Sequence, residues 1–249
     1  MELKTNEITL FGDISICEWL HKVLTKGKNK KEWINSAGKS DPPPDFYNNK
    51  YKLMMDVMRI DDHAYIDEKN RIQNKTLQHE SELFKIIDKP EMANVKVYII
   101  GDTKLPTNED HNYDRYYKNF ERVFKAHERK LDLYQTNHPA FKSIFFIFDE
   151  SSAYMESFDA NDIKKSRFEG EIIACRPHLF CLDKKFVDVI KKSKVDYVIW
   201  YAPWKLIKYS INDESDILPL PKCAIYDVKN LDEKNLVDYN DNLMISSEV

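Results

Sequence analysis

The chain has 249 residues, 38 basic and 42 acidic side chains, and a hydrophobic fraction of 42%. A chain of this length and composition buries a sizeable core, which excludes an intrinsically disordered protein, and a net charge of −4 gives no reason to expect indiscriminate binding to nucleic acid or membranes. Its five glycines exclude collagen-like repeats and glycine-rich phosphate loops in series.

The first predicted element is an amphipathic helix over 14–25 with Asp13 as its N-cap, because apolar residues recur there at helical spacing. Residues 51–60 predict a strand that is largely apolar on both faces, as in the centre of a covered sheet. The polar stretch 61–74 predicts a loop or hairpin. The later predicted elements are a short helix over 80–88, a strand over 95–100, a long helix with an aromatic stripe over 113–134, a buried strand over 143–148, a strand over 171–174, a helix over 183–192 and a strand over 196–200.

This alternation of strands and helices predicts an α/β or α+β fold, with a mixed central β-sheet flanked by helices. We expect residues 1–150 to form an α/β core and 151–230 to continue the same sheet or to form a small subdomain. Residues 231–249 read as an acidic carboxyl-terminal tail whose last dozen residues are loosely held. His127, on the aromatic stripe, is expected to be a packed or partly exposed histidine without a catalytic role.

Charge is distributed unevenly along the chain. Residues 22–39 contain six lysines and one acid, a net charge of +5, and are either a solvated loop or a surface for nucleic-acid phosphates. From residue 211 onward, nine acids oppose three lysines, a net charge of −6. The near-neutral total therefore conceals a basic and an acidic segment.

The four cysteines are scattered without a CxxC pair, which is typical of reduced thiols in the cytoplasm. The amino terminus does not resemble a secretory signal, and no apolar run approaches the ~18 residues of a membrane span. We therefore expect a cytoplasmic protein that is not embedded in a membrane.

Common catalytic motifs are absent. Gly38-Lys39-Ser40 imitates the end of a phosphate-binding loop, but Trp33 occupies the position of the required first glycine and prolines follow where a helix must begin. No GxGxxG, GxSxG or HExxH occurs. Paired carboxylates remain the chemistry that the sequence favours.

Asp45, in Pro44-Asp45-Phe46, is separated by ten intervening residues from Asp56, in Asp56-Val57-Met58-Arg59. This pattern resembles the PD-(D/E)XK superfamily of metal-dependent nucleases. The resemblance implies two carboxylates that hold one or two Mg²⁺ ions, with Asp45 as the first acid and Asp56 as the second. It also implies a core of helix, three strands, helix and strand over roughly 14–150, in which Glu18 matches a helical acid that some members use as a metal ligand.

One position departs from this family pattern, because its lysine falls on Met58. Either a lysine from elsewhere, such as Lys52 or Lys96, activates the attacking water, or the site is inactive. Of the two, we take Lys52 as the candidate catalytic residue. A second copy of the pattern, from Asp216 to Asp227 and Lys229, lies too near the end of the chain to be followed by the rest of the core.

Three classes of function follow. The first is a Mg²⁺-dependent nuclease or a degenerate nuclease-like protein from a low-GC bacterium, phage or mobile element, since abundant Lys, Asn and Ile are typical of AT-rich genomes. The second is a non-catalytic protein-binding factor, phage-encoded or defence-related, which Met58 and the acidic carboxyl end favour. The third is a small-molecule enzyme with its site near Asp102 or Asp149–Glu150, because ligands bind beyond the carboxyl ends of strands.

Overall fold

The computed structural model describes residues 7–25, 31–36, 44–74, 111–161, 175–208 and 217–247, with the isolated helical residues Gln78, Ser81, Glu82 and Lys85. The described helices are α1 (Ile14–Thr25), α5 (Tyr113–Glu128), α6 (Leu131–Asn137) and α8 (Lys184–Lys191), with the 3₁₀ turns η3 (Val228–Asn230) and η4 (Asp241–Leu243). The described strands are β1 (Ile8–Phe11), β2 (Ile34–Asn35), β3 (Phe46–Asn48), β4 (Leu53–Ile60), β5 (Tyr65–Ile66), β6 (Ile72–Gln73), β7 (Lys142–Asp149), β8 (Tyr154–Ser157), β9 (Cys175–Pro177), β10 (Tyr197–Tyr201), β11 (Leu206–Lys208), β12 (Ile217–Pro219), β13 (Cys223–Asp227) and β14 (Met244–Ser246).

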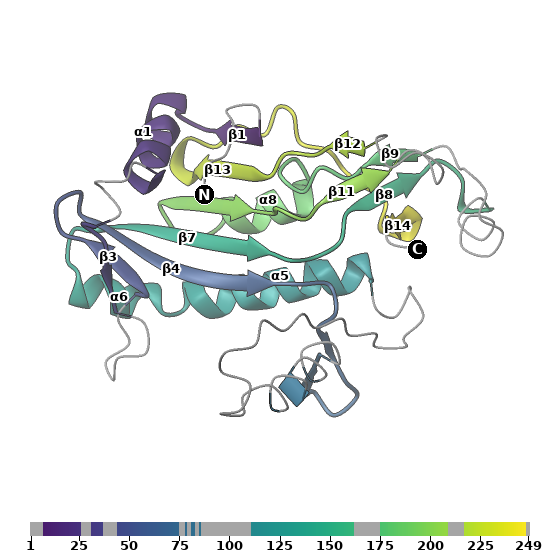
Figure 1. Ribbon diagram of the computed structural model, residues 1–249, viewed down its shortest axis with the longest axis horizontal. Helices are drawn as coiled ribbons and strands as arrows, with labels where there is room; N and C mark the ends of the chain where they lie inside the picture. Colours follow the sequence, from purple (N-terminus) through teal and green to yellow (C-terminus); the bar gives the residue numbers. More distant parts are fainter. Residues whose placement is uncertain are drawn as a thin grey trace, which may run out of the picture.

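A mixed seven-stranded sheet forms the centre of the molecule, in the order β1-β13-β10-β7-β4-β3-β2 (Figure 1). The three central strands β10, β7 and β4 are parallel, whereas β13 is antiparallel to β10 and β3 is antiparallel to β4 and β2. Strands from before and after residue 150 thus share one sheet. The expected α/β fold with a mixed sheet and flanking helices is confirmed.

The helices cover both faces of this sheet, and each strand divides its side chains between them. On one face α1 buries Cys17, Leu20 and Val23 against the sheet, together with Leu53 of β4. Its start is set by Asp13, whose Oδ1 accepts hydrogen bonds from the backbone N–H groups of residues 15 and 16. The helix predicted over 14–25 is therefore confirmed at both ends.

The other face carries the larger core, formed by α5, α8 and the opposite side of the same strands. Phe120 of α5 stacks on Trp200 of β10 with ring centroids 4.8 Å apart, and Phe186 of α8 packs against both rings. Such aromatic pairs contribute about 0.5–1.5 kcal/mol each beyond the area that they bury. The aromatic stripe is thus a core surface, as its spacing predicted.

Three smaller sheets surround the central one. β5 and β6 form the hairpin expected within 61–74, and β11 pairs with β12. The third sheet has the order β14-β8-β9. Because β14 pairs with β8, and because Met244 and Ile245 are buried, the expectation of loosely held residues at the carboxyl end is wrong for this stretch.

Other differences between the predicted and observed elements are local. The helix predicted over 113–134 is two helices, because the N–H groups of Arg129 and Lys130 turn back to the carbonyls of residues 125 and 127. Strands β1 and β13 were not predicted. The strands predicted over 95–100 and 171–174 lie outside the described residues, as does most of the helix over 80–88.

In the part of the chain that the structure describes, no helix is long and apolar enough to cross a membrane.

Asp196, at the start of β10, binds residues of β7 and of η3. Its substitution therefore tests how much these contacts stabilise the fold. Its Oδ2 accepts hydrogen bonds from the N–H and Oγ of Ser143 at 2.9 and 3.1 Å, and its Oδ1 accepts from Lys229 and Lys142 at 2.8 and 3.1 Å. Burial alone raises the pKa of Asp196, but these partners hold it below its ordinary value. Because the folded pKa is the lower one, the stabilisation is present above the unfolded value of about 3.9 and is lost as the pH falls through the folded value.

We expect Asp196→Asn to lower the free energy of unfolding at pH 7 by about 1.5–3 kcal/mol, the range for hydrogen bonds to a charged group. The difference from the parent protein should shrink below about pH 4, where the parent carboxylate begins to take up its proton. Urea unfolding at both pH values measures this. Asp132→Asn is the matched control, because Asp132 is 74% exposed in its ion pair with Lys194. A difference that does not depend on pH would contradict the argument.

Candidate functional site

Asp45 and Asp56 meet on neighbouring strands of the central sheet. Asp45 lies just before β3, and its Oδ2 accepts a hydrogen bond of 2.8 Å from the backbone N–H of Val57 in β4. This bond places the Asp45 side chain near that of Asp56, close enough for the two carboxylates to influence each other's charge. Burial raises the pKa of Asp45, and the neighbouring Asp56 carboxylate raises it further. The antiparallel β3–β4 pair therefore brings the two predicted acids together.

Asp56 is buried and points toward the helices that cover the larger core. Its Oδ2 lies 2.5 Å from Nδ1 of His127 in α5 and accepts a hydrogen bond of 3.2 Å from the hydroxyl of Tyr134 in α6. In a neutral His127 this contact assigns the proton to Nδ1 and leaves the Nε2 lone pair as an acceptor. The arrangement is a carboxylate–imidazole pair, with 20% of the His127 side chain exposed.

Sequence reasoning assigned His127 to packing and did not consider Tyr134 as a functional residue. The histidine does pack, edge-on to Phe145 with ring centroids 6.3 Å apart, but it also binds Asp56. The available signal was that His127 and Tyr134 both belong to the predicted aromatic stripe, which points toward the core. What the spacing did not show was that an acid of β4 lies opposite them.

The other predicted site residues lie elsewhere. Lys52 precedes β4, and its ammonium group lies 5.0 Å from the ring centroid of Phe141. Glu18 belongs to α1, on the opposite face of the sheet from Asp56, and forms an exposed ion pair of 3.6 Å with Lys22. Met58, at the position of the family lysine, is buried in the core against α5. Lys96 and Asp102 lie outside the described residues.

The carboxylate oxygens at this site are the type of ligand atom that Mg²⁺ prefers. Mg²⁺ prefers hard oxygen ligands and is commonly held by one or two carboxylates, with water and substrate phosphate completing the octahedron. The hydrogen bond of Asp45 with Val57 and that of Asp56 with His127 are made through Oδ2 of each carboxylate. Two neighbouring carboxylates, one with a raised pKa, are also the arrangement that a divalent cation stabilises by neutralising their repulsion.

Asp149, at the carboxyl end of β7, has a different environment. It is fully buried, and its carboxylate accepts hydrogen bonds from the Tyr116 hydroxyl at 2.6 Å and the Trp200 indole at 2.8 Å. Ser151 donates to it as well, and the ammonium group of the buried Lys205 lies 3.5 Å away. These partners occupy the carboxylate, so we assign Asp149 to the core and not to ligand binding.

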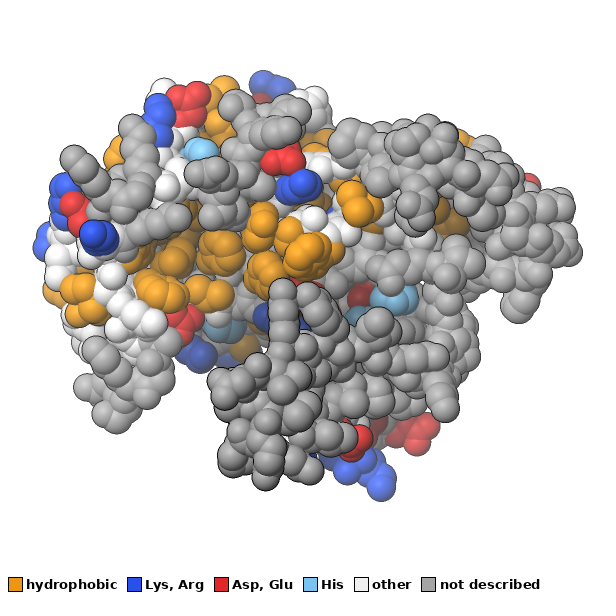
Figure 2. Space-filling view, viewed as in Figure 1, with side chains coloured by type: hydrophobic (Ala, Val, Ile, Leu, Met, Phe, Trp, Pro, Cys, Tyr) orange, Lys and Arg blue, Asp and Glu red, His pale blue; other side chains and the backbone are white. Residues whose placement is uncertain are grey.

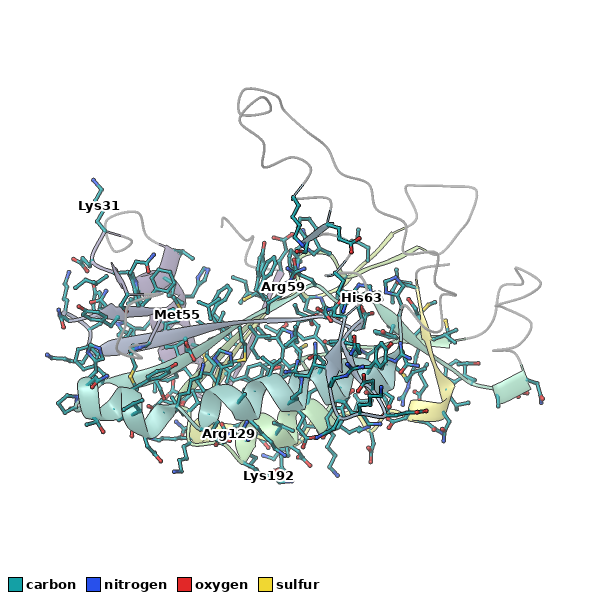
Figure 3. All side chains as sticks on the ribbon, turned by 90° about the horizontal axis from the view of Figure 1, so that it is seen from below. Lys31, Met55, Arg59, His63, Arg129 and Lys192 are labelled. Carbon is teal, nitrogen blue, oxygen red and sulfur yellow. The ribbon has the colours of Figure 1, made fainter. Side chains whose placement is uncertain are left out.

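A separate cluster of Asp62, His63 and His111 lies beyond the carboxyl end of β4. In Figure 3, Met55 lies near one end of β4, whereas Arg59 and His63 lie toward the other. Because Asp56 follows Met55 directly, the Asp45–Asp56 site and the histidine cluster are separated along the strand.

Comparison of the chain with known proteins gave no match among protein-family models, curated proteins or solved structures.

Proposed function

We propose that this protein is a Mg²⁺-dependent phosphodiesterase that cleaves nucleic acid at the Asp45–Asp56 site. The observation that carries the proposal is that these two carboxylates lie close together, Asp45 just before β3 and Asp56 in β4. A phosphodiester needs charge neutralisation and a positioned water, both of which carboxylate-held Mg²⁺ provides. Of the helix, three strands, helix and strand that the family resemblance implies, α1, β3, β4, α5 and β7 support the proposal, whereas the strand predicted over 95–100 lies outside the described residues.

Each side chain has a distinct role in this proposal. Asp45 and Asp56 hold the Mg²⁺ ion, which when bound polarises the phosphoryl oxygen. Because Lys52 lies over Phe141 and position 58 is a methionine, we assign the proton-accepting role to Nε2 of His127. Asp56 keeps the imidazole in the required tautomer through Nδ1, and Tyr134 fixes Asp56 in turn.

The basic segment 22–39 is the proposed contact for the nucleic-acid backbone. Lys31 is exposed and lies at the same end of the molecule as Met55 (Figure 3). A lysine ammonium group such as that of Lys31 fits a phosphate as a point charge and carries no base specificity. Cleavage should accordingly be weakly dependent on sequence and should fall with rising salt.

The test is incubation of the purified full chain with single- and double-stranded DNA and RNA, in Mg²⁺, Mn²⁺ or EDTA. We expect cleavage of at least one substrate with metal and none with EDTA. Asp45→Asn should reduce the rate about 100-fold, since the half-buried Asp45 supplies one of only two protein carboxylates for the cation. Asp132→Asn is the control. Failure to cleave any of the four substrates, or full activity in Asp45→Asn, would overturn the proposal.

A second candidate, a non-catalytic protein-binding factor, is favoured by apolar side chains on the sheet face that packs against α1. Tyr201 contacts both Phe146 and Phe148 there, and all three side chains are only half-buried. Hydrophobic side chains also gather in the centre of the view in Figure 2. This candidate predicts no metal-dependent cleavage. It also predicts a partner, captured from the native host, whose retention is lost with Phe148→Lys and kept with Asp45→Asn.

A further inference from the structure

The carboxyl ends of parallel strands β4 and β7 meet at one edge of the sheet, where α/β proteins commonly bind ligands. Asp62 and His63 follow β4 at this edge, Ser152 follows β7, and His111 comes directly before the N-cap residue of α5. Side chains from three separate stretches of sequence therefore converge at a position that neither the proposed phosphodiester chemistry nor the buried Asp149 network uses.

Three ligand-type atoms face one another in this cluster. The Nδ1 of His111 lies 3.3 Å from Oδ2 of Asp62, and the Nε2 of His63 lies 3.6 Å from Oδ1 of Asp62. The three ligand atoms all lie within 4.8 Å of one another, and the two imidazole rings are 4.9 Å apart at 60°. Two ligands bound at about 2.0–2.1 Å in tetrahedral geometry are themselves about 3.3 Å apart. The spacing therefore accommodates one cation with small side-chain adjustments.

The buried carboxylate supplies an independent observation. Asp62 is 0% exposed, and its Oδ1 has no hydrogen-bond partner among the described residues. A buried carboxylate oxygen without a hydrogen bond is costly, by about 1–3 kcal/mol or more for a charged group. This oxygen is directed toward the cluster, with Nε2 of the His63 imidazole 3.6 Å away. A bound cation would satisfy it.

We propose that Asp62, His63 and His111 bind a transition-metal cation of the Zn²⁺ class, at a site distinct from the Asp45–Asp56 pair. Two imidazole nitrogens and one carboxylate favour Zn²⁺, Co²⁺, Ni²⁺ or Fe²⁺ and disfavour Mg²⁺, which prefers oxygen ligands. Binding through Nδ1 of His111 requires the neutral imidazole to carry its single ring proton on Nε2, because a metal-bound imidazole nitrogen carries no proton. Three protein ligands leave a fourth coordination position for water.

A second layer of residues fixes the carboxylate. Oδ2 of Asp62 accepts hydrogen bonds from the Tyr154 hydroxyl at 2.6 Å, from the Ser152 backbone N–H at 3.1 Å and from the Ser152 hydroxyl. Such outer contacts orient a ligand before the metal arrives and typically change metal affinity 10- to 100-fold when removed. They also explain why Oδ1, and not Oδ2, is left for the cation.

The experiment is a titration of the chelator-treated full chain with Zn²⁺, followed by competition with a chromophoric chelator and by the visible spectrum of the Co²⁺ form. We expect one equivalent of Zn²⁺ and an intense Co²⁺ spectrum of low coordination number. His63→Gln and His111→Gln should each weaken Zn²⁺ binding at least 100-fold, because each removes one of three ligands. A 10-fold excess of Mg²⁺ should not displace the Zn²⁺.

His138→Gln is the matched control, because His138 contacts Tyr47 and Phe141 away from the cluster, and it should leave Zn²⁺ binding unchanged. Circular dichroism and thermal unfolding establish that each variant is folded, since the side chains of His63 and His111 are only 17% and 14% exposed. The proposal is overturned if the parent protein binds no stoichiometric Zn²⁺ or if both glutamine variants bind as the parent does. Neither outcome affects Mg²⁺-dependent cleavage, so the two proposals fail separately.

Discussion

Lys205→Met is expected to lower the free energy of unfolding by about 3–5 kcal/mol, the usual cost of removing one partner from a buried ion pair. Lys205 is 1% exposed, and its ammonium group donates hydrogen bonds to the Ser151 hydroxyl at 2.6 Å and the Ser152 carbonyl at 2.9 Å. It also lies 3.5 Å from the Asp149 carboxylate and 4.6 Å from the ring centroid of Tyr116. Methionine retains the apolar stem but leaves the buried Asp149 charge without its cation.

Chemical denaturation of the parent and the variant at pH 7 measures this loss. Lys234→Met is the control, because Lys234 is 84% exposed in its ion pair with Asp232 and such pairs contribute about 0–1 kcal/mol. Adding Asp149→Asn to Lys205→Met should recover part of the loss, since the double variant no longer buries an unpaired charge. If Lys205→Met lowers the free energy of unfolding by less than about 1 kcal/mol, the hydrogen bonds from Tyr116, Trp200 and Ser151 are sufficient to stabilise the Asp149 carboxylate.

The elements that were predictable from the sequence are those whose signal is local. Helix α1 follows from Asp13 and the apolar spacing behind it, and α8 begins after Asp183, whose side chain accepts from the backbone N–H of Lys185. Strands β4 and β7 are long and apolar on both faces, as central parallel strands must be. In each case the residues that determine the element lie within it or next to it.

Strands β1 and β13 were missed because their stability is not local. Each has four or five residues, too few for periodicity to distinguish a strand from a loop. They pair with each other across more than 200 positions, with Ile8 opposite Cys223, and all five residues of β13 are buried. Gly12 directly follows β1, and a Cβ at this position would lie 2.6 Å from the carbonyl oxygen of Asp227 in β13. A larger residue would therefore clash where the two strands end.

The residues of the candidate site also differ in whether a local sequence signal predicts them. The pairing of Asp45 with Asp56 was predictable from a short motif, since one hairpin connects β3 to β4. The contact of Asp56 with His127 joins residues 71 positions apart, and that of Asp62 with His111 joins residues 49 apart. Both depend on how α5 crosses the sheet, which no single segment encodes. The sequence therefore indicated the acids but neither histidine partner.

His127→Ala is expected to reduce kcat for nucleic-acid cleavage by about 10²–10⁴, the usual contribution of a positioned general base. The reason is geometric: Asp56 binds Nδ1, so the remaining Nε2 is the nitrogen that accepts a proton from the attacking water. Mg²⁺ affinity should change little, because Asp45 and Asp56 remain. Single-turnover rates with saturating Mg²⁺ separate the chemical step from binding.

Added imidazole distinguishes this role from a structural one. In His127→Ala the lost ring leaves space beside Asp56. Free imidazole should therefore restore part of the cleavage rate, in proportion to its concentration. In His127→Gln the glutamine side chain leaves less space, so imidazole should restore less of the rate. His138→Ala, which removes a ring in tilted contact with Tyr47 and leaves the backbone bond to Tyr134 in place, should neither lose the rate nor respond to imidazole. If His127→Ala retains full kcat, the imidazole only supports Asp56 and the base must be another group. If kcat falls without rescue while the unfolding free energy also falls, His127 is a positioning residue for Asp56, because a proton acceptor supplied from solution would otherwise replace it.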